Sequence, residues 1–357
     1  MLCYLLVVTD SIIYFFIVYE LLIILLFLVL YLTSNSRGGI DALVSYLGWA
    51  LIGSFSVAMG FFFLILLTNQ YKFSTLDLAH LSSTDVYHIY MFFFFCFGIK
   101  LSVWPFWYWL PKAHVEVSTG MSIFLSCILI KIAYFCLLKI QLILPLEINL
   151  NIFLIFCTFC IIDLVSKFIN LKDLKAIVAY SSVLHTNLLV LLNHIDTSKI
   201  ITSSILYVWG HSLATACLFI CVYLIEQRYH TRNILYISGL WQNFPEIGML
   251  LLASIIFFLD FPLTLLYWGE IWLWLLLFNN FFSLASLIYI SSNIIFISLS
   301  FKFWWGILCG TASQQSKPKN LLFHYNIMII TGWFIVIQIF TGIQPSLLTS
   351  LFSFIMN

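Results

Sequence analysis

Six ionisable residues of this sequence lie near the middle of long apolar segments, where a charged group is costly. They are Glu20, Lys100, Lys131, His185, His211 and Glu270. A charge at the centre of a bilayer costs on the order of 3 kcal/mol, and a lysine arm is too short to bring its ammonium group from that depth to water. Glutamate, lysine and histidine are also common proton carriers in catalysis. Six such groups at similar depth indicate a proton or ion relay.

Each of these residues has a plainer interpretation, as an isolated polar group that one neighbour satisfies. A lone histidine such as His185 favours that interpretation. The two lysines together with the two glutamates favour a relay, because a Lys–Glu pair can take up or release a proton when one partner moves. Asp10 and Asp163 lie near predicted helix ends, where solvated residues are expected, and Asp260 fits either interpretation.

Two prolines stand close to two of the charges. Pro105 follows Lys100 by five residues, and Pro262 precedes Glu270 by eight. Proline interrupts an α-helix, and a helix broken beside a charge exposes backbone groups to a water-filled cavity, as in many transporters. We therefore expect broken helices at Lys100–Pro105 and at Pro262–Glu270.

The composition indicates the elements that must position these residues. Of the 357 residues, 63% are hydrophobic and 8% are charged, whereas soluble domains carry about 25% charged residues. A helix needs about 20 apolar residues to cross a bilayer. The sequence thus predicts an all-α membrane protein of ten transmembrane helices, near 10–33, 42–68, 87–110, 119–145, 150–168, 173–193, 199–225, 244–278, 283–311 and 322–345.

The positions of lysine and arginine predict the orientation of these helices. Ten of the fifteen fall in alternate loops on one side, and three fall in the opposite loops. By the positive-inside rule, the side with ten faces the cytoplasm or the mitochondrial matrix.

The spacing of the charges suggests an internal repeat. Glu20 precedes Lys100 by 80 residues, and His185 precedes Glu270 by 85. We expect a first half-channel repeat over 1–145, a second over 146–311, and a C-terminal transmembrane helix within 312–357.

Motifs for cofactors and metals are absent from the sequence. It has no G-x-x-x-x-G-K-[ST] phosphate loop, no G-x-G-x-x-G after a strand and no paired histidines at metal spacing. Cys157 and Cys160 form a C-x-x-C inside an apolar run, without a second pair, which favours small buried hydrophobic residues. We expect no cofactor or metal on this chain, so that an ion gradient or a partner must drive any transport.

Several motifs resemble the antiporter-like chain 4 subunits of NADH dehydrogenase, respiratory complex I. The most specific are "WLPKAHVE" (109–116), preceded by Lys100, and "DLKAIVAYSSVLH" (173–185). Others follow in the family's order: "FFIVYELLI" (15–23), "WGHSLATACLF" (209–219), "YHTRNILYISGL" (229–240) and "FPLTLLYWGE" (261–270).

The resemblance implies an antiporter-like bundle with two pseudo-inverted repeats and a role for each matching residue. Glu20 and Lys100 would be the charged pair of the first half-channel, and Lys131 would link the halves. His185 and His211 would continue the axis to Glu270. The chain would translocate protons, while FMN, the iron–sulfur clusters and ubiquinone bind to other subunits.

The resemblance also implies an assembly in the mitochondrial inner membrane. Its partners would be chains 2 and 5, accessory subunits and lipids such as cardiolipin, without nucleic acid. The family has about fourteen helices and this sequence begins near the end of the fourth, so a separate chain is expected to supply three to four helices unless they are lost. The sequence departs from the family's pattern at Ser102, Trp107 and Val117-Ser118, around the first broken helix.

Two other functions fit the same features. One is a subunit of a multisubunit Na⁺/H⁺ antiporter or a membrane-bound hydrogenase, which share this fold. The other is a structural membrane subunit that does not pump, although it would not explain four buried charges occurring together.

Overall fold

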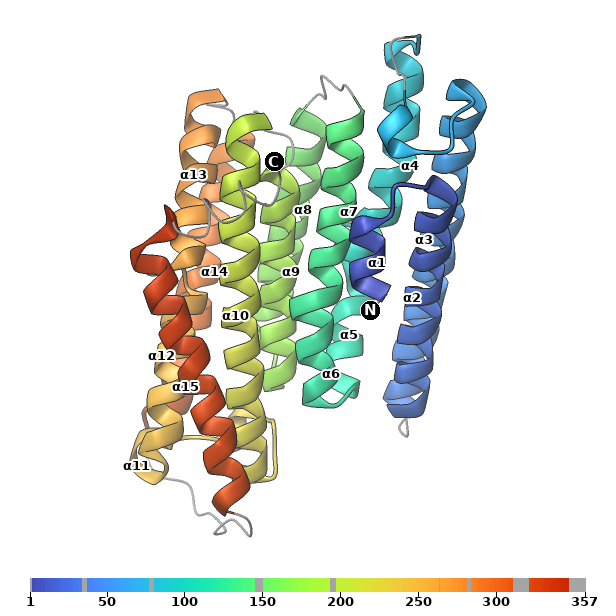
Figure 1. Ribbon diagram of the computed structural model, residues 1–357. Coiled ribbons are helices and arrows are strands. Elements are labelled where there is room, and N and C mark those ends of the chain that lie inside the picture. Colours follow the sequence, from blue (N-terminus) through green and yellow to red (C-terminus); the bar gives the residue numbers. More distant parts are fainter. Residues whose placement is uncertain are drawn as a thin grey trace.

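Long helices standing side by side make up the protein (Figure 1). The computed structural model describes residues 2–33, 37–76, 80–144, 150–192, 197–262, 264–280, 284–310 and 321–346. The α-helices are α1 (Leu2–Val8), α2 (Ile12–Thr33), α3 (Arg37–Thr68), α4 (Ser83–Leu101), α5 (Trp109–Glu116), α6 (Thr119–Phe124), α7 (Ile130–Ile143), α8 (Leu150–Phe168), α9 (Leu174–Leu192), α10 (Thr197–Tyr229), α11 (Leu240–Asn243), α12 (Pro245–Phe258), α13 (Leu265–Asn280), α14 (Leu284–Leu308) and α15 (Leu321–Ile343).

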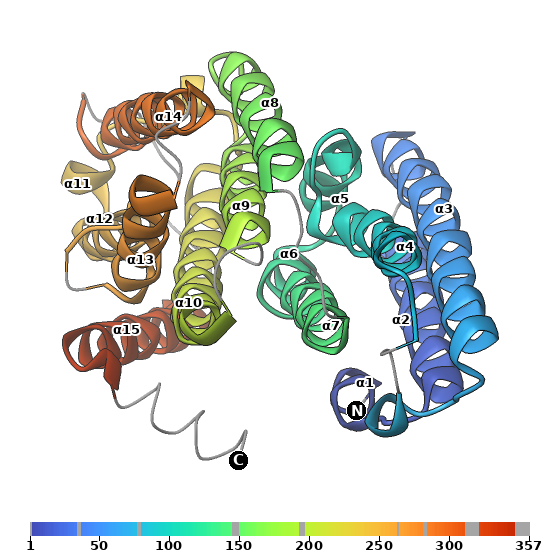
Figure 2. The ribbon, with the colours of Figure 1, turned by 90° about the horizontal axis from the view of Figure 1, so that it is seen from above.

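Seen from above, the helices form two groups joined by a central set (Figure 2). Helices α2, α3 and α4 lie at one end, and α12 to α15 lie at the other. Helices α7, α9 and α10 stand between them, and α10 packs against α9, α12 and α13. The predicted site residues Lys131, His185 and His211 therefore belong to the three central helices.

All ten predicted segments are helical, which confirms the all-α fold. Several boundaries differ from the prediction by a few residues; α3, for example, begins at Arg37, five residues before the predicted start. Helix α4 begins four residues earlier than expected because the Ser82 side chain caps it, accepting a hydrogen bond from the Asp85 amide at 3.2 Å. Helix α10 extends to Tyr229, since polar residues can continue a helix beyond its apolar segment. The short α1 was not predicted as a separate helix.

The surface of the bundle suits a membrane. Within the described residues, six helical stretches are long and apolar enough to cross one: Ile12–Leu32, Arg37–Thr68, Ser83–Glu116, Thr119–Ile143, Ser203–Tyr229 and Tyr325–Ile343. Large apolar side chains face outward, among them Phe55 at 69% exposure and Phe340 at 63%. Helices that satisfy their own backbone hydrogen bonds can present such faces to lipid.

The first predicted break is present and follows Lys100 directly. Helix α4 ends at Leu101, and Ser102 takes a left-handed conformation with φ of 59°. The chain then passes Pro105 before α5 begins at Trp109. The indole N–H of Trp109 donates to the carbonyl of Ile99 at 2.8 Å, so the break keeps this buried carbonyl satisfied.

The second predicted break is also present. Helix α12 ends at Phe258, and α13 begins at Leu265. Between them, Asp260 adopts a positive φ of 54°, two residues before Pro262. The breaks fall one in each predicted half; the half-channel boundaries and the inverted relation of the halves stay predictions.

Candidate functional site

The centre of the candidate site is a contact between Lys131 of α7 and His211 of α10. The Lys131 Nζ atom lies 2.6 Å from His211 Nδ1. Both side chains are buried, Lys131 at 8% exposure and His211 at 0%. The lysine therefore points into the bundle, between helices, and its charge has a partner at hydrogen-bond distance.

A π-helical turn helps to fix the position of the Lys131 side chain. Residues Leu125–Leu129, immediately before α7, form this turn, and Lys131 Nζ donates to the carbonyl of Ser126 at 2.7 Å. Single π-turns inside helices frequently mark functional sites. Here the turn provides a backbone acceptor that fixes the ammonium group beside His211.

His185 of α9 extends the cluster. Its ring centroid lies 5.0 Å from that of His211, and its Nδ1 atom lies 2.6 Å from the hydroxyl of Tyr207. His185, His211 and Tyr207 are all buried. Three helices thus bring a lysine, two imidazoles and a phenol into one polar cluster in the interior.

Glu270 lies on the far side of this cluster, in the first part of α13. It is 5% exposed, and it is hydrogen-bonded to the carboxyl group of Asp260 in the break. The ring of Phe258, the last residue of α12, lies 4.7 Å from His185 and 6.2 Å from His211 between centroids. The histidine cluster therefore adjoins the break that carries the two carboxyl groups.

Lys100 and Glu20 lie on neighbouring helices without a direct ion pair. Lys100 Nζ donates to the hydroxyl of Tyr46 at 3.1 Å and lies 4.9 Å from the centre of that ring. Glu20 accepts a hydrogen bond from the hydroxyl of Ser54 at 2.6 Å. Tyr46 is therefore the group that contacts the Lys100 ammonium.

A cavity lies between Lys100 and the helix that carries Lys131. It measures about 40 Å³. Apolar side chains such as Leu129 and Ile130 line most of it, and Tyr19, Tyr46 and Lys100 are its polar lining residues. A cavity needs about 10–15 Å³ to hold one water molecule, so this one has room for water next to the Lys100 ammonium. The structure thus brings Lys131, His185 and His211 together, and separates them from Lys100 by this space.

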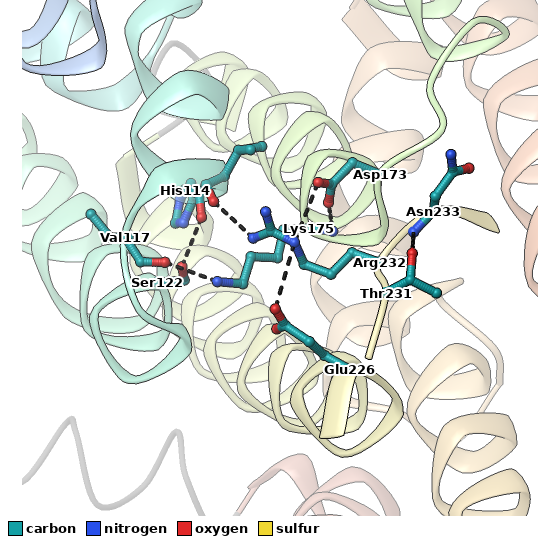
Figure 3. A network of polar contacts seen from close by, with 10 residues as sticks. His114, Val117, Ser122, Asp173, Lys175, Glu226, Thr231, Arg232 and Asn233 are labelled. Carbon is teal, nitrogen blue, oxygen red and sulfur yellow. Dashed lines mark hydrogen bonds and ion pairs between the residues drawn. The ribbon is translucent and has the colours of Figure 1, made fainter. Parts of the chain in front are cut away.

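A second polar network links residues within or next to three of the sequence motifs (Figure 3). Lys175 at the start of α9 is 3% exposed and donates to the carbonyl of Val117 at 2.8 Å. Arg232 lies 3.5 Å from Asp173 and 3.7 Å from Glu226, measured between Nε and the carboxylate oxygens. These contacts tie the turn after α5 to the start of α9 and the end of α10.

Sequence reasoning missed several of these groups. Tyr46 and Tyr207 carry no charge and are common in apolar segments, so hydropathy gives no signal for them. For Asp260, the sequence fitted both a relay residue and an isolated polar group. Cys157 and Cys160 are buried on α8, and within the described ranges no group of three or more His, Cys, Asp or Glu residues could hold a metal ion.

A helix bundle with two broken helices and buried Lys, His and Glu side chains between them is the arrangement of a membrane ion transporter. Residues 9–297 match the NADH:quinone oxidoreductase/Mrp antiporter transmembrane family. The chain belongs to this family.

The chain is similar to NADH-ubiquinone oxidoreductase chain 4 of several organisms. It is 30% identical to that of Paramecium tetraurelia over 70% of this chain and 52% of the relative. It is 27% identical to that of Acanthamoeba castellanii over 76% of this chain and 55% of the relative. The chain thus spans about half the length of the relatives that it matches.

Solved structures share the fold. A chain of respiratory complex I from Thermus thermophilus aligns with a TM-score of 0.83 at 20% identity, covering 94% of this chain and 72% of that one. A chain of the Mrp complex from Dietzia sp. aligns with a TM-score of 0.83 at 18% identity, covering 95% and 72%.

Proposed function

We propose that this chain is a proton-translocating membrane-arm subunit of respiratory complex I. The observation that carries the proposal is the buried contact between Lys131 and His211, which continues through His185 towards Glu270. Groups that exchange protons are costly inside a bundle and are typical of proton paths in pumps and transporters.

The contact geometry provides the elementary step. An ammonium group has no acceptor lone pair, so His211 accepts at Nδ1 and is neutral while Lys131 is charged. Transfer of the proton across the 2.6 Å contact leaves a neutral amine and an imidazolium. That step moves one proton from α7 to α10, and the ring of His185 stands next along the axis.

The two ends of the axis lie beside the broken helices. On one side, Lys100 supplies or receives a proton, next to the α4–α5 break and beside a cavity with room for water. On the other, Glu270 takes that place beside the α12–α13 break. A small displacement of either break changes the distances between proton carriers, and in this way a partner's conformational change is coupled to translocation.

Redox chemistry takes place on other subunits under this proposal. FMN, the iron–sulfur clusters and ubiquinone bind there, and this chain contributes to NADH:ubiquinone reduction by coupling it to proton transport. Chains 2 and 5, accessory subunits and lipids such as cardiolipin are the expected partners, in the mitochondrial inner membrane. The relatives named NADH-ubiquinone oxidoreductase chain 4 support this assignment.

The alternative is a subunit of a multisubunit Na⁺/H⁺ antiporter, because the Mrp complex shares the fold. Extraction in mild detergent followed by identification of co-purifying chains separates the two. Flavin- and iron–sulfur-binding subunits are expected with complex I. Co-purification with membrane antiporter chains alone would overturn the assignment, and assembly into complex I without any dependence of pumping on the buried charges would identify a structural subunit.

A further inference from the structure

Asp260 is a buried carboxyl group that the proton axis described above does not use. It lies in the break between α12 and α13, and its side chain is hydrogen-bonded to that of Glu270. Its Oδ1 atom is buried and has no hydrogen-bond partner among the described residues. Glu270 is itself 5% exposed, so the two carboxyl groups meet inside the protein.

Two ionised carboxylates cannot form this hydrogen bond, because each has only acceptor oxygens. The bond requires a proton on one of them, and two carboxyl groups that are hydrogen-bonded to each other resist being ionised at the same time. We propose that Asp260 and Glu270 form a carboxyl pair that shares one proton, which makes Asp260 a second proton-carrying site at the break. This inference rests on the proposed function and names a residue of the same axis.

The backbone at Asp260 supports a specific role for its side chain. Its φ of 54° lies in the left-handed region, which glycine favours and which aspartate, asparagine and histidine adopt more often than other residues. A glycine would fit the turn at no steric cost, whereas this chain has an aspartate there. The aspartate at this turn therefore places a carboxyl group inside the break, which a glycine would not supply.

The surroundings connect the pair to the histidine cluster. Phe258, two residues before Asp260, packs against the rings of both His185 and His211. Gly269, one residue before Glu270, lies against the backbone of Tyr207. The titratable groups that α9 and α10 present to this region are therefore the two histidines and Tyr207, and Glu270 is the charged group that acts on Asp260.

A shared proton changes what the end of the axis can do. With one shared proton the pair carries a single negative charge. It can accept a second proton and become neutral, and releasing that proton returns it to the singly charged state. The unpaired Oδ1 atom leaves an acceptor for an incoming donor. Because Asp260 lies in the break itself, movement of α12 against α13 separates the two oxygens and forces the shared proton onto one of them.

Infrared spectroscopy of the assembled complex with carboxyl-labelled aspartate and glutamate tests the pair directly, because a protonated carboxylic acid and a carboxylate absorb at different frequencies. The variants are Asp260→Asn and Glu270→Gln, in which the amide keeps the shape and can still donate a hydrogen bond. Asp260→Gly fits the left-handed backbone and serves if the Asn variant does not assemble. Asp41→Asn, at an exposed position on α3, is the control.

The expected result is one protonated-carboxyl band that shifts or disappears in the Asp260 variants and in Glu270→Gln, and is unchanged in Asp41→Asn. A band that responds to Glu270→Gln but not to the Asp260 variants, or no responsive band, would overturn the proposal. Proton translocation is measured on the same preparations. A wild-type complex with the band but without pumping would contradict the proposed function and leave the carboxyl pair intact.

Discussion

Replacing Gly210 with alanine should push α10 and α13 apart. A Cβ atom at this position would lie 2.6 Å from the backbone nitrogen of Leu266 and 2.9 Å from the Cβ of Leu265. Backbone atoms cannot rotate out of the way. On the opposing helix, a Cβ at Gly269 would lie 2.8 Å from the Cβ of Tyr207, so small residues on both helices allow this close approach.

The expected cost follows from these distances. Ordinary contacts begin at 3.4 Å, against the 2.6 Å found here, so the helices must separate by several tenths of an ångström. Overpacking of this kind costs about 1–3 kcal/mol. Gly332→Ala is the matched control, because its Cβ would meet nothing within 4 Å. Both variants gain a similar helix propensity, so the difference in their unfolding free energies isolates the clash.

The same displacement should lower proton transport. Gly210 precedes His211 and Gly269 precedes Glu270, so separating the helices moves the two proton carriers apart. A misplacement of about 1 Å can reduce a reaction rate about a hundredfold. Thermal unfolding in detergent and proton uptake by sealed vesicles measure the two effects. Equal melting temperatures and equal transport in Gly210→Ala and Gly332→Ala would refute the reasoning.

Three further outcomes are expected. Lys131→Ala leaves the Ser126 carbonyl and His211 Nδ1 without their ammonium partner. Each unsatisfied buried group costs about 1–3 kcal/mol, so thermal unfolding should show a loss of stability that the exposed Lys302→Ala variant does not show. Equal stability of the two variants would contradict the buried contact. Ser82→Ala removes the cap of α4 and should cost about 1 kcal/mol, seen as faster amide exchange in the first turn of α4 alone. In the loop outside the spans, hydrogen bonds from Ser74 hold the pKa of Asp10 below its usual value. The contact therefore stabilises the loop at neutral pH and is lost as the pH falls through the pKa of folded Asp10, and amide exchange of Ser74 should lose protection in acid, but show no such dependence in Asp10→Asn.

The helices and both breaks could be predicted from the sequence. Long apolar runs identify spans because no water satisfies the backbone within a bilayer. Pro105 and Pro262 locate the breaks because proline cannot continue a helix. The depth of Lys131 and His211 followed from their position within those spans, although their contact did not.

The partners of the buried groups could not be predicted, because hydropathy gives depth but not the rotation of a helix about its axis. Rotation places Tyr46, rather than Glu20, against Lys100. The π-turn at Leu125–Leu129 shifts the register of Lys131 through hydrogen bonds that no residue type signals. Asp260 lies in the break with a positive φ, a backbone conformation that hydropathy does not reveal.

The central claim, that buried proton carriers move protons through this chain, is tested most directly by Lys131→Met. Methionine keeps the approximate volume of the side chain and removes its titratable group. Lys302→Met, at an exposed position on α14, is the control. The variant complexes are reconstituted in sealed vesicles, and NADH oxidation and internal pH are recorded together. We expect proton translocation to fall in Lys131→Met, with NADH oxidation falling in step, and to be unchanged in Lys302→Met. Full translocation at full turnover, in a complex shown to contain the Lys131→Met chain, would contradict the claim.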